Sequence, residues 1–106
     1  MAMAEYAWTS FNSNAKVFEH IPQDPTKTRF HPTAKPIALY EWILGLYGEK
    51  GYKILDTHVG SASSLIACHR GGYEYVGFEI DEDYYVKAKE RLDAETAQMN
   101  IFDFLN

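Results

Sequence analysis

The pattern of apolar and polar positions divides the chain into three stretches of different character. Residues 5–20 alternate aromatic and β-favouring side chains with polar ones on both sides of the turn-forming "NSN", which predicts a β-hairpin. Residues 21–36 contain all four prolines of the chain, so we predict a loop that no helix or central strand crosses. From residue 37 to 96, helical spacing alternates with short apolar runs, which is typical of an α/β fold.

The third stretch is predicted to be a helix followed by a strand–helix–strand–helix unit. The two strands of such a unit are expected to be parallel neighbours joined by a right-handed crossover. The continuous apolar centre of "YKILD" predicts that its strand is buried on both faces. Residues 97–106 fit either a short strand or a packed tail. The expected elements are a helix from 37 that glycines end at 48–51, a strand at 52–56, a helix at 63–70, a strand at 73–79, and a helix at 81–95 with Asp81 as N-cap and Tyr85, Ala88 and Leu92 as its inner stripe.

Composition limits the kind of protein. The 106 residues, 46% hydrophobic and 24% charged, suit one small ordered domain, and the aromatic content of 15% suggests extra surface for a partner or ligand. A net charge of −5 argues against nucleic-acid binding by the whole chain. The single cysteine, Cys68, excludes an internal disulfide and favours a reducing, cytoplasmic location. No apolar run approaches the roughly 20 residues of a membrane helix, so no membrane association is expected.

The segment "DTHVGSAS" (56–63) connects the first predicted strand of the βαβα unit to a helix. Ligands of open α/β sheets bind outside the carboxyl ends of the strands, and Asp56 stands at such an end. Gly60 permits a backbone conformation and a close approach that a side chain would block. The helix start that follows offers unpaired N–H donors. A tight turn without a ligand remains the alternative interpretation of this segment alone.

Glu79 ends the second strand of the unit, 23 residues after Asp56. An acid about 20 residues beyond a glycine turn commonly accepts hydrogen bonds from ribose hydroxyls, although a solvated strand-end acid is the simpler reading of Glu79 alone. Together, the turn and the acid favour a nucleoside site. Neither GxxxxGK[ST] nor GxGxxG occurs, so a P-loop is excluded and a dinucleotide site is not supported.

Three motifs in this order, "HPTAKP" (31–36), "ILDTHVGSASS" (54–64) and "GFEID" (77–81), resemble the S-adenosylmethionine-binding half of the amino-group DNA methyltransferases. These enzymes methylate the exocyclic amine of adenine or cytosine. The resemblance covers nearly the whole chain, and it implies a partial Rossmann-like methyltransferase fold as one partial domain. That domain would comprise the hairpin at 5–20, the proline loop at 21–36 and the cofactor-binding part at 37–96.

The resemblance also implies a set of cofactor contacts. The family's common turn is DPFxGSGTT; here Thr57 and His58 replace its proline and phenylalanine, and Ala62 replaces its second glycine. His58 would border the cofactor, and a metal-ligand role for it is disfavoured because no second ligand sits at a useful spacing. The implied cofactor-binding residues are His31, Thr33 and Lys35 near the methionine end, then Asp56, His58, Gly60, Ser61, Ser63 and Glu79.

The family's catalytic [D/N/S]PP[Y/F] motif, which holds the target amine and stacks on the flipped base, has no counterpart here. No PP dipeptide occurs, and "QDPT" (23–26) lacks both the second proline and the aromatic residue. We therefore expect no catalytic residue in this chain, and contact with DNA only together with a complementary catalytic half. A homodimer or a partner chain is expected as well, because the family sheet has two strands between "YKILD" and the hairpin that are missing here, which leaves unpaired strand edges; direct pairing of the hairpin with "YKILD" is the alternative. A non-catalytic nucleotide-binding or regulatory module, an inactive remnant and a structural piece without ligand are the alternatives.

Overall fold

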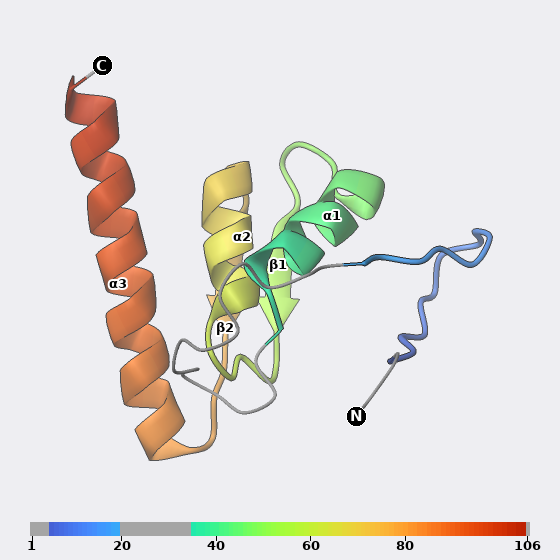
Figure 1. Ribbon diagram of the computed structural model, residues 1–106, viewed down its shortest axis with the longest axis horizontal. Helices are drawn as coiled ribbons and strands as arrows, with labels where there is room; N and C mark the ends of the chain where they lie inside the picture. Colours follow the sequence, from blue (N-terminus) through green and yellow to red (C-terminus); the bar gives the residue numbers. More distant parts are fainter. Residues whose placement is uncertain (1–4, 20–34, 106) are drawn as a thin grey trace.

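The computed structural model describes residues 5–19 and 35–105, and its elements follow the predicted strand–helix–strand–helix order (Figure 1). They are α1 (Ile37–Tyr47), β1 (Lys53–Asp56), α2 (Ser63–Gly71), β2 (Glu74–Gly77) and α3 (Glu82–Leu105). The predicted α/β fold with a βαβα unit is confirmed. No helix in the described ranges is both long enough and apolar enough to cross a membrane.

The two strands are parallel neighbours and run in register. Lys53 lies opposite Glu74 at one end of the sheet, and Asp56 lies opposite Gly77 at the other. Within the described residues, β1 and β2 form the whole sheet. Both strands therefore end at the same level, and the segments that follow them leave from one edge of the sheet.

Helix α2 is the centre of the molecule, because α1, α3 and both strands all pack against it (Figure 1). Its side chains are mostly small, so the surrounding elements approach closely. The helix ends where Gly72 adopts a left-handed conformation (φ 80°) that suits glycine. The buried residues of the core are Ser61, Ala62, Ser63, Ser64, Leu65, Ile66, Ala67 and Cys68, together with Ala88 of α3.

The prediction that the first strand is buried on both faces is wrong. Leu55 is 63% exposed and its neighbour Val76 is 57% exposed, whereas Ile54 and Tyr75 are half-buried. Side chains alternate between the two faces of a strand, and α2 covers only one face of this sheet. Over the other face, the described residues provide no second layer.

The predicted hairpin is also not formed, since residues 5–19 contain no strand; residue 20 lies outside the described residues. An isolated two-stranded hairpin is marginally stable without a further strand or helix to cover it. The segment instead runs past α1. Phe11 stacks on Tyr47 with ring centroids 4.5 Å apart, and Phe18 lies 5.3 Å from Trp42. The predicted proline loop falls almost entirely outside the described residues.

The last helix is longer than predicted and continues through the segment whose structure was left open. Asp81 caps it as expected, because its carboxylate accepts a hydrogen bond of 3.0 Å from the backbone N–H of Tyr84. No glycine or proline interrupts residues 96–105, so the helix has no stop signal before Leu105.

A candidate nucleoside-binding cleft

The segments that leave the two strands stay connected beyond the sheet. The N–H of Phe78 donates to the carbonyl of Asp56 at 2.9 Å, and the N–H of Val59 donates to the carbonyl of Phe78 at 3.0 Å. These bonds hold the glycine turn against the segment after β2. A cleft of about 480 Å³ opens at this edge, lined by Thr57, His58, Gly77, Phe78, Glu79, Ile80 and Tyr85.

Glu79 joins the two segments directly. One carboxylate oxygen accepts a hydrogen bond of 2.8 Å from the N–H of Gly60, and the other accepts one of 3.0 Å from the N–H of Asp81. Gly60 has a left-handed backbone (φ 59°), which presents its N–H to the carboxylate without strain. A carboxylate has about four lone-pair positions, so each oxygen of Glu79 can still accept a hydrogen bond from a ligand.

Asp56 is engaged within the chain. One of its oxygens accepts a hydrogen bond of 2.9 Å from the N–H of His58, and the other accepts one from the hydroxyl of Ser64. The carboxylate thus ties the end of β1 to the start of the turn and to the first turn of α2. Burial is the main cause of the raised pKa of Tyr40 on α1, and the negative charge of Asp56 raises this pKa further.

Lys35 is the one predicted contact of the 31–36 motif that the structure describes; His31 and Thr33 lie outside the described residues. The ammonium group of Lys35 forms an ion pair of 2.8 Å with Glu5. Its positive charge favours ionisation of Tyr40, against the larger opposing effects of burial and Asp56 on that pKa. The charges of Lys35 and Asp56 thus both act on Tyr40, in opposite directions.

His58 lies at the exposed wall of the cleft. Its Nδ1 and the hydroxyl of Thr57 are 2.8 Å apart and share a hydrogen bond. Among the described residues, no group of three or more His, Cys, Asp and Glu side chains could hold a metal ion. The position suits a ring that borders a ligand.

The structure brings Ser61 and Ser63 together, but inside the turn. Their hydroxyl oxygens are 3.1 Å apart, and both residues are buried. A ligand in the cleft would meet these residues through backbone groups, because N–H groups at the start of a helix lack partners within the helix. Sequence reasoning did not anticipate that both hydroxyls face the interior.

Sequence reasoning also missed four residues near the site: Phe78, Ile80, Tyr85 and Arg91. The first three line the cleft, and Ile80 is almost completely exposed there. Tyr85 was assigned only to the inner stripe of the last helix. Arg91 reaches the turn from α3 by donating to the carbonyl of Ser61 at 2.8 Å. Arg91 follows Ala88 by about one helical turn and so lies on the same side of α3; this spacing was the available signal that its side chain faces the core.

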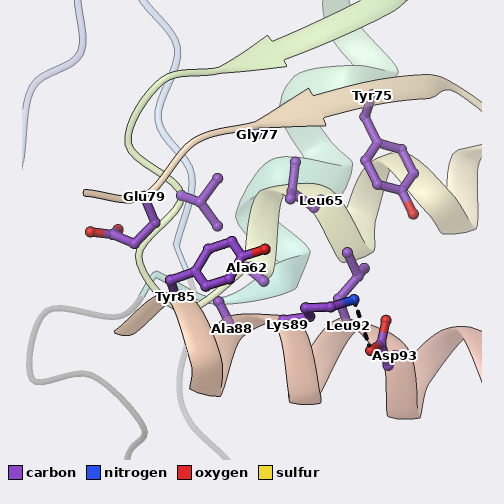
Figure 2. A pocket seen from close by; sticks show the side chains of 11 residues that line it. Ala62, Leu65, Tyr75, Gly77, Glu79, Tyr85, Ala88, Lys89, Leu92 and Asp93 are labelled. Atoms are coloured by element: carbon purple, nitrogen blue, oxygen red, sulfur yellow. Dashed lines mark hydrogen bonds and ion pairs between the residues drawn. The ribbon is translucent and has the colours of Figure 1, made fainter. Parts of the chain in front are cut away.

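A second, apolar groove of about 240 Å³ lies beside the cleft, between α3 and the surface of α2 and β2 (Figure 2). Ala62 and Leu65 face Ala88 and Leu92 across it. Glu79, Gly77 and Tyr85 border both hollows. The stripe predicted for the last helix therefore faces the core side, although Tyr85 remains half exposed.

Gly77 allows the close approach between β2 and the turn. A β-carbon there would collide with Cγ2 of Val59 and lie 2.8 Å from Cδ1 of Leu65. We expect Gly77→Ala to lower the free energy of unfolding by about 1–3 kcal/mol, as overpacking does. Gly45→Ala is the matched control, because a β-carbon there meets nothing within 4 Å and glycine disfavours a helix interior. Thermal or urea unfolding measures both; equal effects of the two variants would refute this packing account.

Comparison with known proteins agrees with the motifs. A family model described as DNA methylase, for N6 and N4 methyltransferases, matches residues 5–90. Type II methyltransferase M.HpaI of Haemophilus parainfluenzae is 35% identical over 94 residues, which are 89% of this chain and 29% of the relative. Type II methyltransferase M2.DpnII of Streptococcus pneumoniae is 37% identical over 65 residues, which are 61% of this chain and 24% of the relative.

A solved structure resembles the fold as well. The crystal structure of the M1.HpyAVI–SAM complex matches 68% of this chain and 41% of its own, with 27% sequence identity and a TM-score of 0.56. The chain thus spans less than a third of the two relatives named above and less than half of this structure. Because the family model covers most of its length, the chain belongs to the DNA methylase family of N6 and N4 methyltransferases.

Proposed function

We propose that this chain binds S-adenosylmethionine in the cleft at the carboxyl ends of β1 and β2. The observation that carries the proposal is the hydrogen bond of 2.8 Å between the Gly60 N–H and Glu79, which sets an acid beside a glycine turn. That is the arrangement expected for a bound ribose. The likeness to the structure of a SAM complex supports the same ligand.

Each site residue has a role in this proposal. Glu79 accepts hydrogen bonds from the ribose hydroxyls, while Gly60 lets the cofactor approach the backbone. Ser61 and Ser63 contribute backbone N–H groups, and His58 borders the ligand. Asp56 mainly shapes the turn, because both of its oxygens already accept hydrogen bonds within the chain. Near the methionine end, the proposed contacts are Lys35, His31 and Thr33.

We further propose that the chain is the cofactor-binding portion of a site-specific methyltransferase acting on an exocyclic amine of adenine or cytosine in DNA. The family supports this reaction, and S-adenosylmethionine would supply the methyl group. None of these 106 residues forms a PP dipeptide, so the catalytic motif has to come from outside them. A cytoplasmic location remains part of the proposal, supported by the one buried free cysteine.

Equilibrium dialysis with the purified chain tests the cofactor. S-adenosylmethionine and S-adenosylhomocysteine should bind saturably and compete with each other. ATP and adenosine should bind at least about tenfold more weakly, because they lack the methionine end. Preferential binding of ATP would favour the nucleotide-binding module, and a folded chain that binds none of these compounds would favour a structural piece.

The bare face of the sheet predicts self-association or a partner chain. Leu55 and Val76 leave apolar surface open there, and parallel strands normally occur in sheets covered on both faces. Both outer strand edges are unpaired within the described residues, and such edges pair readily with other chains. We expect light scattering to give at least twice the monomer mass of 12.1 kDa.

A pair of variants locates the interface. Leu55→Lys with Val76→Lys should shift the chain toward monomer, because two charges would be buried without partners. Leu46→Lys on α1 is the control, since it adds the same charge to an exposed site away from the sheet. A monodisperse monomer at high concentration, before any substitution, would contradict association.

A further inference from the structure

Arg91 connects the far helix α3 to the glycine turn. One guanidinium nitrogen, Nη1, donates hydrogen bonds to the carbonyl of Ser61 at 2.8 Å and to the hydroxyl of Ser63 at 3.0 Å. Ser61 is 5% exposed and Ser63 is 3% exposed, so both acceptor residues are buried, whereas Arg91 itself is half-buried. Burial also lowers the pKa of Arg91, which is the cost of desolvating its charge. A guanidinium in this setting needs well-placed acceptors.

The residue between these two acceptors has an unusual backbone. Ala62 has φ 71° and ψ 12°, and within the described residues it is the one non-glycine residue with a positive φ. This left-handed conformation is unfavourable for a residue with a β-carbon. The side chain is also fully buried, beside Leu65 at the apolar groove (Figure 2). Such strained residues persist only where their surroundings hold them.

The hydrogen bonds of Arg91 and the left-handed backbone of Ala62 depend on each other. Arg91 donates hydrogen bonds to Ser61 and Ser63, the residues on either side of Ala62. These hydrogen bonds would be lost if the backbone of Ala62 relaxed to a more favourable conformation. The turn shaped by Ala62 carries Gly60, whose N–H contacts Glu79, and it leads into α2. A change at Ala62 would therefore move the groups that face the cleft.

We propose that Arg91 is a positioning residue, whose guanidinium holds Ser61 and Ser63 so that Ala62 keeps the left-handed conformation required by the cofactor turn. This inference rests on the proposed cofactor function for its purpose, although the clamp itself can be tested without ligand. Glycine adopts the left-handed conformation freely, so Ala62→Gly should make the turn less dependent on Arg91.

Arg91→Met tests the clamp, with Arg70→Met as the matched control. Arg70 also links α2 to α3, through an ion pair of 3.2 Å with Glu95, but it does not touch the turn. Both variants are made in the unchanged chain and in the Ala62→Gly background. Hydrogen exchange of the backbone amides of residues 59–64, without cofactor, is the first readout, because it reports local opening of the turn.

Arg91→Met should speed this exchange about tenfold or more, whereas Arg70→Met should change it by about twofold or less. In the Ala62→Gly background, the effect of Arg91→Met should fall to about threefold or less. Equal effects of the two arginine variants would overturn the clamp. An effect of Arg91→Met that is the same in both backgrounds would overturn its link to Ala62.

The dissociation constant of S-adenosylmethionine for the same variants is the second readout. Arg91→Met should raise it about tenfold, Arg70→Met by less than about twofold, and the Ala62→Gly background should again reduce the effect of Arg91→Met. A faster-exchanging turn with unchanged affinity would overturn the positioning role. If the unchanged chain binds no cofactor, the proposed function fails, while the exchange readout still decides for or against the clamp.

Discussion

Glu79→Ala is expected to raise the dissociation constant of S-adenosylmethionine about 10-fold to 100-fold. The side chain is proposed to accept ribose hydroxyls, and a hydrogen bond to a charged group contributes about 1.5–3 kcal/mol. The substitution also removes the acceptor for the N–H groups of Gly60 and Asp81, so the two segments that form the cleft lose their link. Calorimetric titration of the folded variant measures the effect.

Two further variants show whether the effect is specific. Glu74→Ala removes an acid of β2, the strand that precedes Glu79, but Glu74 is exposed and its ion pair with Lys53 is 3.5 Å long, so affinity should not change. Gly60→Val should weaken binding as well, since a β-branched residue is strongly disfavoured at φ 59°. If Glu79→Ala and Gly60→Val both fold and bind like the unchanged chain, the cofactor does not occupy this cleft.

The second large effect concerns the reaction itself: the purified chain alone is expected to transfer no methyl group to DNA. Amine methylation needs polar groups to hold the target amine and an aromatic ring to stack on the flipped base. These 106 residues contain no PP dipeptide, and they match only 29% of the length of M.HpaI. Transfer of labelled methyl groups from S-adenosylmethionine to DNA of mixed sequence measures the activity.

A complementation assay makes this expectation informative. Adding a separately produced segment that carries a DPPY-type motif, taken from an intact family member, should give transfer that depends on both pieces. Glu79→Ala should then reduce the transfer at low cofactor concentration, because the cofactor would bind more weakly. Reproducible transfer by the purified chain alone would mean that a catalytic site exists within these residues.

Short sequence patterns correctly predicted the elements whose formation depends on residues close together in the chain. Helical spacing, the capping Asp81 and the glycines after each helix located α1 and α2 closely and fixed where α3 begins. The pairing of β1 with β2 followed from the short helical crossover between them. The positions of Gly60 and Glu79 at neighbouring strand ends followed from the same pairing.

The predictions that were wrong or missing concern contacts between residues that are far apart in the sequence. Whether residues 5–19 form a hairpin depends on a neighbouring strand that extends it, and within the described residues β1 and β2 pair only with each other. The exposure of Leu55 and Val76 has the same origin, because it depends on what covers the sheet. The bonds from Arg91 to the turn span about 30 residues, and the left-handed backbone of Ala62 runs against the preference of alanine. The helical spacing from Ala88 indicates only the side of α3 on which Arg91 lies and not its partners, and the preference of alanine gives no indication of the backbone of Ala62.

Backbone amide shifts of the ¹⁵N-labelled chain during titration with S-adenosylmethionine show where the cofactor binds. Saturable shifts are expected at residues 57–64 and 77–81, the two segments that form the cleft and that Glu79 joins. Amides at the far end of the sheet, around Lys53 and Glu74, should stay unchanged. If the amides of the folded chain do not shift, or shift only away from the turn and Glu79, S-adenosylmethionine does not bind in this cleft.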